Sequence, residues 1–172
     1  QSGTALLKKI VIAPDSFKGS LTAHEAADAM EQGVLQVLPD AHVIKHPVSD
    51  GGEGLVSVVT PALGGCIVTT NVSGPLPGQR IDARWGLSSD GSIAIIEMAE
   101  AAGLTLVPAD RRDPKITTTY GVGELIRAAL DAGVSSILIG IGGSATNDGG
   151  AGMAEALGIR FLDKSGNPLA RG

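Results

Sequence analysis

The sequence predicts an α/β protein that begins with parallel strands and continues with antiparallel strands in the middle of the chain. Short Ile- and Val-rich runs alternate with helical stretches, which is typical of parallel strands joined by crossover helices. In the middle of the chain, turn-rich segments too short for a helix separate the strand-like runs. Aromatic residues make up 2% of the chain and 25 residues are glycine, so the core must use Ile, Val, Leu and Ala between many special turns.

The first 65 residues follow a strand–helix–strand–helix order. Residues 8–13 form a β-branched run that Pro14 ends, and Thr22 and Glu25 have the spacing of a capping box before a helix that reaches about residue 38. A second strand is expected at residues 42–46 and a second helix near residues 55–59. This order predicts parallel strands with crossover connections.

The middle of the chain changes from crossovers to hairpins. Residues 67–73, 80–87 and 92–98 are strand-like and are separated by PLPGQ and SSDG, which predicts antiparallel pairing. We therefore expect a second domain or an insertion to begin near residue 66. The predicted organisation is a tag or N-terminal tail at 1–7, the start of one α/β domain at 8–65, and a second, incomplete α/β domain with a mixed sheet at 66–172.

The last third returns to alternating elements. We expect a helix at 124–131 ended by Gly133, a buried strand at 136–141, a helix at 153–157 and a short strand at 159–162. No element that would close the fold follows, so the chain is expected to be a truncated form of a longer protein.

Composition excludes several classes of protein. Thirteen basic against eighteen acidic residues give a net charge of −5 without a basic cluster, which argues against a nucleic-acid partner. No segment has the roughly 20 apolar residues of a membrane span and no signal peptide is evident, so we expect a cytoplasmic protein. The single cysteine allows no intrachain disulfide, and the three histidines lack zinc-ligand spacing.

Three loops follow predicted strands, and we name them loop 1 (residues 15–20), loop 2 (residues 49–54) and loop 3 (residues 142–150). In open α/β sheets, ligands bind at the carboxyl ends of the strands. The N–H groups of a following helix and of glycine-rich turns suit anions there. These loops are therefore the candidate functional segments.

Loops 1 and 2 carry charged side chains that could serve catalysis. In loop 1, Lys18 could neutralise a carboxylate or phosphate, and Asp15 could orient a hydroxyl or hold a metal. In loop 2, the carboxylates of Asp50 and Glu53 could hold magnesium or accept a hydroxyl proton. The structural alternatives are a capped turn with a solvated lysine, and an acidic first helical turn that complements the helix dipole.

Loop 3 has the most specific pattern, with four glycines, two hydroxyls, an amide and one carboxylate after a hydrophobic strand. Its N–H and hydroxyl groups suit phosphate oxygens, and Asp148 could hold a metal or act as a base. Residues 140–145 also satisfy G-x-G-x-x-A, with Asp163 about twenty residues on, a dinucleotide-binding pattern that keeps an NAD-dependent dehydrogenase of a small hydroxy acid open. A Walker-type phosphate loop is absent from the sequence.

Three segments together resemble a known family. APDSFKGSLTA (13–23), PVSDGGEG (47–54) and GIGGSATNDGGAG (140–152) are similar to signature segments of the bacterial glycerate kinase family (type 1, glycerate 2-kinase), as are IEMAEAAGL and TTTYGVGEL. The likeness runs in the family's order from about residue 8 to the end of the chain, as its N-terminal portion. Ser49 and Leu55 depart from the residues common in relatives, but neither is a carboxylate.

The resemblance implies transfer of the ATP γ-phosphoryl group to glycerate with Mg²⁺, giving phosphoglycerate, with 2-phosphoglycerate favoured. It implies a flavodoxin-like domain and a mixed-sheet domain with the site between them, in proteins about twice this length, and a homodimer is possible. A catalytically incomplete ligand-binding fragment and a sugar-diacid-responsive regulator are the alternatives outside catalysis. The implied catalytic residues are Lys18, Asp50 and Asp148, the last two also as metal ligands. The implied substrate- and phosphate-binding residues are Asp15, Ser16, Lys18, Gly51, Gly52, Glu53, Gly142, Gly143, Ser144, Thr146 and Asn147.

Overall fold

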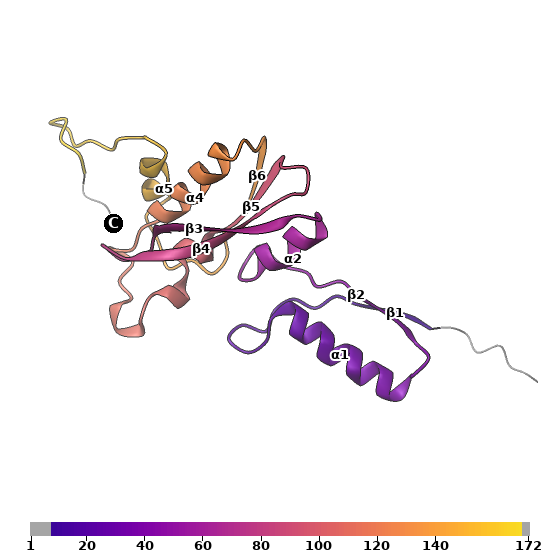
Figure 1. The fold of residues 1–172 in the computed structure, drawn as a ribbon. Helices are drawn as coiled ribbons and strands as arrows, with labels where there is room; N and C mark the ends of the chain where they lie inside the picture. The colour runs from indigo at the N-terminus through magenta and orange to yellow at the C-terminus, as the bar shows by residue number, and fades with distance from the viewer. Residues whose placement is uncertain (1–7, 170–172) are drawn as a thin grey trace, which may run out of the picture. The chain divides into compact units, whose positions relative to one another are not determined.

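The computed structural model describes residues 8–169 and confirms the α/β class, with one parallel and one mixed sheet (Figure 1). Its contacts divide the chain into an N-terminal unit, Gln1–Ser49, and a C-terminal unit, Asp50–Gly172. The strand connections do change from a crossover to hairpins near residue 66. The boundary between the two units lies earlier, between Ser49 and Asp50 in loop 2. The predicted tag or tail at residues 1–7 lies outside the described residues, and the domain assignment for the complete protein stays a prediction.

The N-terminal unit is a β–α–β arrangement. Strands β1 (Lys9–Ile12) and β2 (His42–Lys45) pair in parallel, and helix α1 (Ala23–Val37) connects them. The capping box is confirmed: the Glu25 N–H donates to Thr22 Oγ1 at 3.2 Å, and the Thr22 N–H donates to Glu25 Oε2 at 2.8 Å.

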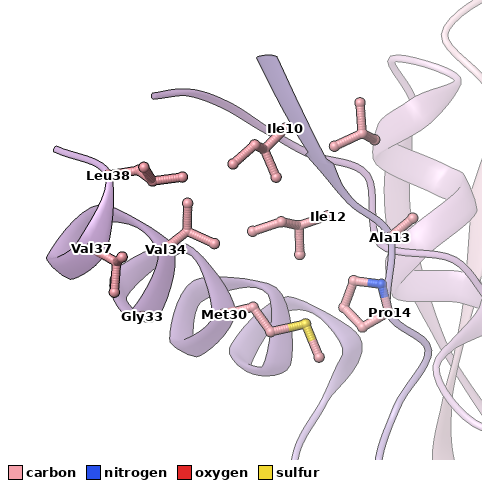
Figure 2. A pocket seen from close by; sticks show the side chains of 10 residues that line it. Ile10, Ile12, Ala13, Pro14, Met30, Gly33, Val34, Val37 and Leu38 are labelled. Atoms are coloured by element: carbon pink, nitrogen blue, oxygen red, sulfur yellow. The ribbon is translucent and has the colours of Figure 1, made fainter. Parts of the chain in front are cut away.

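An apolar cavity of about 690 Å³ lies between β1 and α1 (Figure 2). Ile10 and Ile12 approach it from the strand, and Met30 and Val34 from the helix. No charged side chain lines it, so it offers no attraction to an anionic substrate. We therefore do not place the functional site there.

The C-terminal unit is built on a four-stranded mixed sheet with the order β3-β4-β5-β6. Strands β3 (Cys66–Ser73), β4 (Arg80–Leu87) and β5 (Ile93–Glu97) pair in antiparallel fashion, as the short connections predict. Strand β6 (Ser136–Gly140) is parallel to β5, with Glu97 opposite Gly140. The carboxyl ends of β5 and β6 therefore lie at the same edge of the sheet.

Helices cover both faces of this sheet (Figure 1). Helix α2 (Leu55–Ala62) packs on Ile95 through Leu55 and Val56. The neighbouring Ile96 points to the other face, where it joins a core cluster with Leu125 of helix α4 (Tyr120–Asp131). The remaining helices are α3 (Met98–Ala102), α5 (Ala151–Ala156) and two 3₁₀ turns, η1 (Leu104–Leu106) and η2 (Ala109–Arg111).

Five elements differ from the sequence-based expectation. Helix α3 and the 3₁₀ turns were not predicted, and α4 begins at Tyr120 rather than near residue 124. The strand expected at 159–162 is reduced to one bridge between Leu162 and Pro168, with no neighbouring strand among the described residues. None of the helices within residues 8–169 is both long and apolar enough to cross a membrane.

Candidate functional site

Loops 2 and 3 touch through their backbones at the edge where β5 and β6 end. The Gly142 N–H donates to the Gly51 carbonyl oxygen at 3.1 Å. A Cβ at Gly142 would lie 2.5 Å from Gly52 Cα, and a Cβ at Gly140 would lie 2.5 Å from the Gly51 carbonyl oxygen. Only glycine permits this approach, so two segments about 90 residues apart in sequence lie together and form one candidate site.

A buried carboxylate holds loop 2 against the sheet. Glu97, at the end of β5, is 3% exposed and accepts hydrogen bonds from the N–H groups of Gly54 (3.1 Å) and Val56 (3.3 Å). Helix α2 has no side-chain cap of its own, so Glu97 caps it from the neighbouring strand. Burial raises the pKa of Glu97, and the two N–H bonds oppose that shift.

Sequence reasoning missed Glu97. Its sequence signal is an acidic residue at the end of the otherwise apolar strand IAIIE. A carboxylate placed there is costly unless it meets donors. Such a residue is therefore a candidate anchor for a neighbouring helix or loop.

Asp148 of loop 3 is a hydrogen-bond centre. Its Oδ2 accepts from the Thr119 N–H (2.8 Å), Thr119 Oγ1 (2.8 Å) and the Gly152 N–H (3.1 Å), while Oδ1 accepts from the Gly150 N–H (3.0 Å). Partial burial raises the pKa of Asp148, but the bonds from Thr119, Gly150 and Gly152 outweigh burial and lower it. The carboxylate thus ties loop 3 to the starts of α4 and α5.

The first half of loop 3 presents unused donors. Ser144 Oγ lies 2.8 Å from Thr146 Oγ1 and accepts the Thr146 N–H at 3.0 Å, which fixes the turn. Within residues 8–169, no acceptor is recorded for the backbone N–H groups of Gly143, Ser144 and Asn147. Such a run of N–H groups suits the oxygens of a phosphate.

A pocket of about 360 Å³ adjoins this half of loop 3. Leu104, Val107 and Pro114 form an apolar wall, and Arg112 contributes a positive charge. Its other lining residues are Asp113, Thr117, Ser144, Ala145, Thr146 and Asn147. The pocket therefore combines a cation, polar groups and an apolar surface, as small-molecule sites commonly do.

The acidic residues of loop 2 face solvent. Asp50 and Glu53 are exposed, and Asp50 Oδ1 accepts the Gly52 N–H at 2.9 Å. In the described part of the chain, no three His, Cys, Asp or Glu side chains gather into a group that could hold a metal. Magnesium needs only one or two protein carboxylates when phosphates supply the other ligands, so Asp50 fits a shared site of that kind.

Loop 1 belongs to the N-terminal unit. Asp15 Oδ1 accepts the Ser16 N–H at 2.6 Å, and reciprocal backbone bonds between Phe17 and Leu21 close the turn. Lys18 is exposed near its tip. The structure thus brings together the predicted site residues of loops 2 and 3, while those of loop 1 form a turn of their own unit.

The dinucleotide pattern does not have the expected geometry. After Gly140, the chain runs through the whole of loop 3 before α5 begins at Ala151, whereas the fingerprint requires a helix at once. Asp163 is exposed and accepts the N–H groups of Ser165 and Asn167 in its own turn. The pattern therefore gives no support to nicotinamide binding.

A mixed sheet with a glycine-rich loop, acidic residues and unused N–H donors at its carboxyl edge defines an α/β protein with a candidate anion-binding site. The chain belongs to the glycerate kinase family, whose sequence profile matches residues 10–172. It is 54% identical over 164 residues to the glycerate 2-kinase of Escherichia coli K12 and 58% identical over 164 residues to the glycerate kinase of Bacillus subtilis 168. Each match covers 95% of this chain and 43% of the relative.

A solved structure shows the same similarity. The crystal structure of a protein assigned as glycerate kinase 2 from Salmonella typhimurium LT2 is 58% identical and has a TM-score of 0.80, covering 96% of this chain and 44% of that one. The chain therefore spans less than half the length of the relatives that it matches.

Proposed function

We propose that the complete protein transfers the γ-phosphoryl group of ATP to D-glycerate and that its product is 2-phosphoglycerate. Membership of the glycerate kinase family supports glycerate phosphorylation, and the glycerate 2-kinase of E. coli is 54% identical. Phosphoryl transfer depends on positioning and on neutralising negative charge more than on covalent chemistry by the protein. The site should therefore offer donors for phosphate oxygens beside carboxylates that share a metal.

The backbone contact between Gly142 and Gly51 is the observation that carries this proposal. It joins the donors of loop 3 to the carboxylates of loop 2 at one edge of the sheet. Glu97 pre-organises the start of α2 at the same edge through hydrogen bonds within the chain. Such pre-organisation lowers the cost of holding the reacting groups in place.

Each site residue has a proposed role. The N–H groups of Gly143, Ser144 and Asn147 bind phosphate oxygens, supported by the Gly142 contact and the Thr146 hydroxyl. Asp50, with Glu53 in support, would hold Mg²⁺, and a metal held there would supply positive charge against the phosphates. Lys18 of loop 1 binds a transferring phosphoryl oxygen, with Asp15 and Ser16 shaping its turn.

Asp148 requires a separate assignment. Four donor groups lie within 3.1 Å of its oxygens and match the roughly four lone-pair sites of a carboxylate, which supports a positioning role over direct contact with metal or substrate. Its roles as base and as metal ligand stay predictions, as do the homodimer and the cytoplasmic location.

Phosphorus NMR of D-glycerate, Mg²⁺ and ATP with the complete protein tests the function. A new phosphomonoester resonance together with ADP is expected, and its proton coupling identifies the phosphorylated hydroxyl. The same experiment with residues 1–172 tests the alternative that this part of the chain only binds ligands. Absence of the resonance with the complete protein, under conditions in which it is folded, would contradict the proposal.

A further inference from the structure

Arg112 is a cation in the loop 3 pocket that the motif-based reasoning did not single out. Its Nε–H donates to the Val107 carbonyl oxygen at 3.3 Å, which holds one edge of the guanidinium against the pocket wall. Among residues 8–169, no carboxylate forms an ion pair with it, whereas Arg80 and Arg84 pair with Glu124 and Glu100. The terminal nitrogens of Arg112 therefore keep their donors for a ligand.

We propose that this pocket binds the carboxylate of the hydroxy-acid substrate and that Arg112 is the residue that recognises it. The inference rests on the proposed function, which supplies a hydroxy acid as the substrate. A guanidinium presents paired N–H donors that match the two oxygens of a carboxylate. The apolar wall of Leu104 and Val107 suits the carbon chain of such an acid, which inorganic phosphate lacks.

The size and surroundings of the pocket favour a small acid over a nucleotide. Its volume of about 360 Å³ is near the lower end of the roughly 300–1,000 Å³ found for ligand sites. Thr117 Oγ1 donates to the Ala145 carbonyl oxygen at 2.8 Å, and this hydrogen bond holds loop 3 against the segment that carries Thr117. Ser144, Thr146 and Asn147 line the pocket on the loop 3 side, so the phosphate that their donors would bind lies next to the acceptor.

One lining group opposes an anion. The Asp113 carboxylate also lines the pocket, and its Oδ1 accepts the Lys115 N–H at 3.0 Å. A bound carboxylate must therefore sit on the Arg112 side. This asymmetry makes the affinity depend on the guanidinium rather than on the overall charge of the pocket.

The test is calorimetric titration of the complete protein with D-glycerate, with and without a non-hydrolysable ATP analogue and Mg²⁺. Arg112→Gln is expected to weaken glycerate binding about tenfold or more, because it removes a charge-assisted hydrogen bond. Arg112→Lys should restore part of that affinity. Arg111→Gln, an exposed neighbour outside the pocket lining, is the matched control and should bind glycerate like the wild type.

Separate outcomes distinguish the pocket from the proposed function. Unchanged glycerate affinity in Arg112→Gln, or no glycerate binding by the wild type in either titration, overturns the inference. Weaker binding of the ATP analogue with unchanged glycerate binding assigns the pocket to nucleotide phosphates and also overturns it. If the wild type binds glycerate through Arg112 but forms no phosphomonoester, the pocket stands and the kinase proposal fails.

Discussion

The Gly142 N–H and the Gly51 carbonyl oxygen lie 3.1 Å apart and join loop 3 to loop 2. A methyl group at position 142 would lie 2.5 Å from Gly52 Cα, a backbone atom that cannot rotate away. The two loops must therefore separate if residue 142 carries a side chain.

Gly142→Ala is expected to destabilise the complete protein by about 1–3 kcal/mol, the usual cost of overpacking, and to reduce turnover. Urea denaturation and an ADP-release assay measure the two effects. Gly33→Ala is the control, because Gly33 lies within α1 with nothing within 4 Å of its added Cβ. Wild-type turnover in Gly142→Ala would show that the contact does not support the site.

Asp148→Asn is expected to lower stability by about 1–3 kcal/mol at pH 7, because the amide nitrogen cannot accept the N–H groups that the carboxylate binds. The pKa of Asp148 is lowered in the folded protein. The carboxylate therefore stabilises the fold at pH values above the ordinary aspartate pKa of about 3.9, and this stabilisation is lost as the pH falls through the pKa of the folded state. The difference between variant and wild type should therefore shrink below about pH 4.

Urea denaturation across pH measures that difference, with Asp131→Asn as the control. Asp131 is exposed at the end of α4 and has no recorded side-chain partner among the described residues. Full stability with lost turnover in Asp148→Asn would instead favour a direct role as base or metal ligand.

Glu97→Gln tests the buried cap of α2 through its pH dependence. Burial raises the pKa of Glu97 in the folded protein, so the protonated side chain stabilises the fold. This stabilisation is lost as the pH rises from about 4.3, the ordinary glutamate pKa, through the pKa of the folded state. The wild-type stability curve should fall over that window, and the variant should lack this fall. Parallel curves for the two proteins would show that Glu97 does not titrate as its burial requires.

Lys18→Met tests loop 1. Lys18 is exposed, so stability should change by less than about 0.5 kcal/mol, whereas loss of a charge-assisted contact should lower kcat/KM by about ten- to a hundredfold. Steady-state kinetics of the complete protein measure kcat/KM, and Lys9→Met, at another exposed lysine, is the control. An unchanged kcat/KM would remove Lys18 from the site.

Local signals in the sequence predicted much of the fold. The Thr22–Glu25 spacing marked the start of α1, and the short connection after Ser73 predicted the β3–β4 hairpin. The start of α4 was missed because its glycines indicate a loop, yet Gly121 packs directly against Ser73 and Gly123 against Met153. Glycine there serves close packing rather than a turn.

The candidate site was predictable only in part. The sequence singled out loops 1, 2 and 3, and only loop 3 by residue types that a purely structural loop rarely combines. The Glu97 cap joins residues more than 40 positions apart, and Arg112 becomes a candidate only through the pocket around it. The acidic residue at the end of the apolar strand IAIIE marks Glu97 as unusual, but the sequence does not show which helix its carboxylate meets, and Arg112 has no comparable local signal.

The most direct test of the phosphate-binding role of loop 3 is amide NMR of the ¹⁵N-labelled complete protein during titration with Mg²⁺ and a non-hydrolysable ATP analogue. The N–H resonances of Gly143, Ser144 and Asn147 should shift with the same saturation curve as the bound analogue, while that of Gly133, in the turn after α4, should not. If the analogue saturates the protein and these three resonances stay in place, the nucleotide phosphates bind elsewhere and the account of the site is wrong.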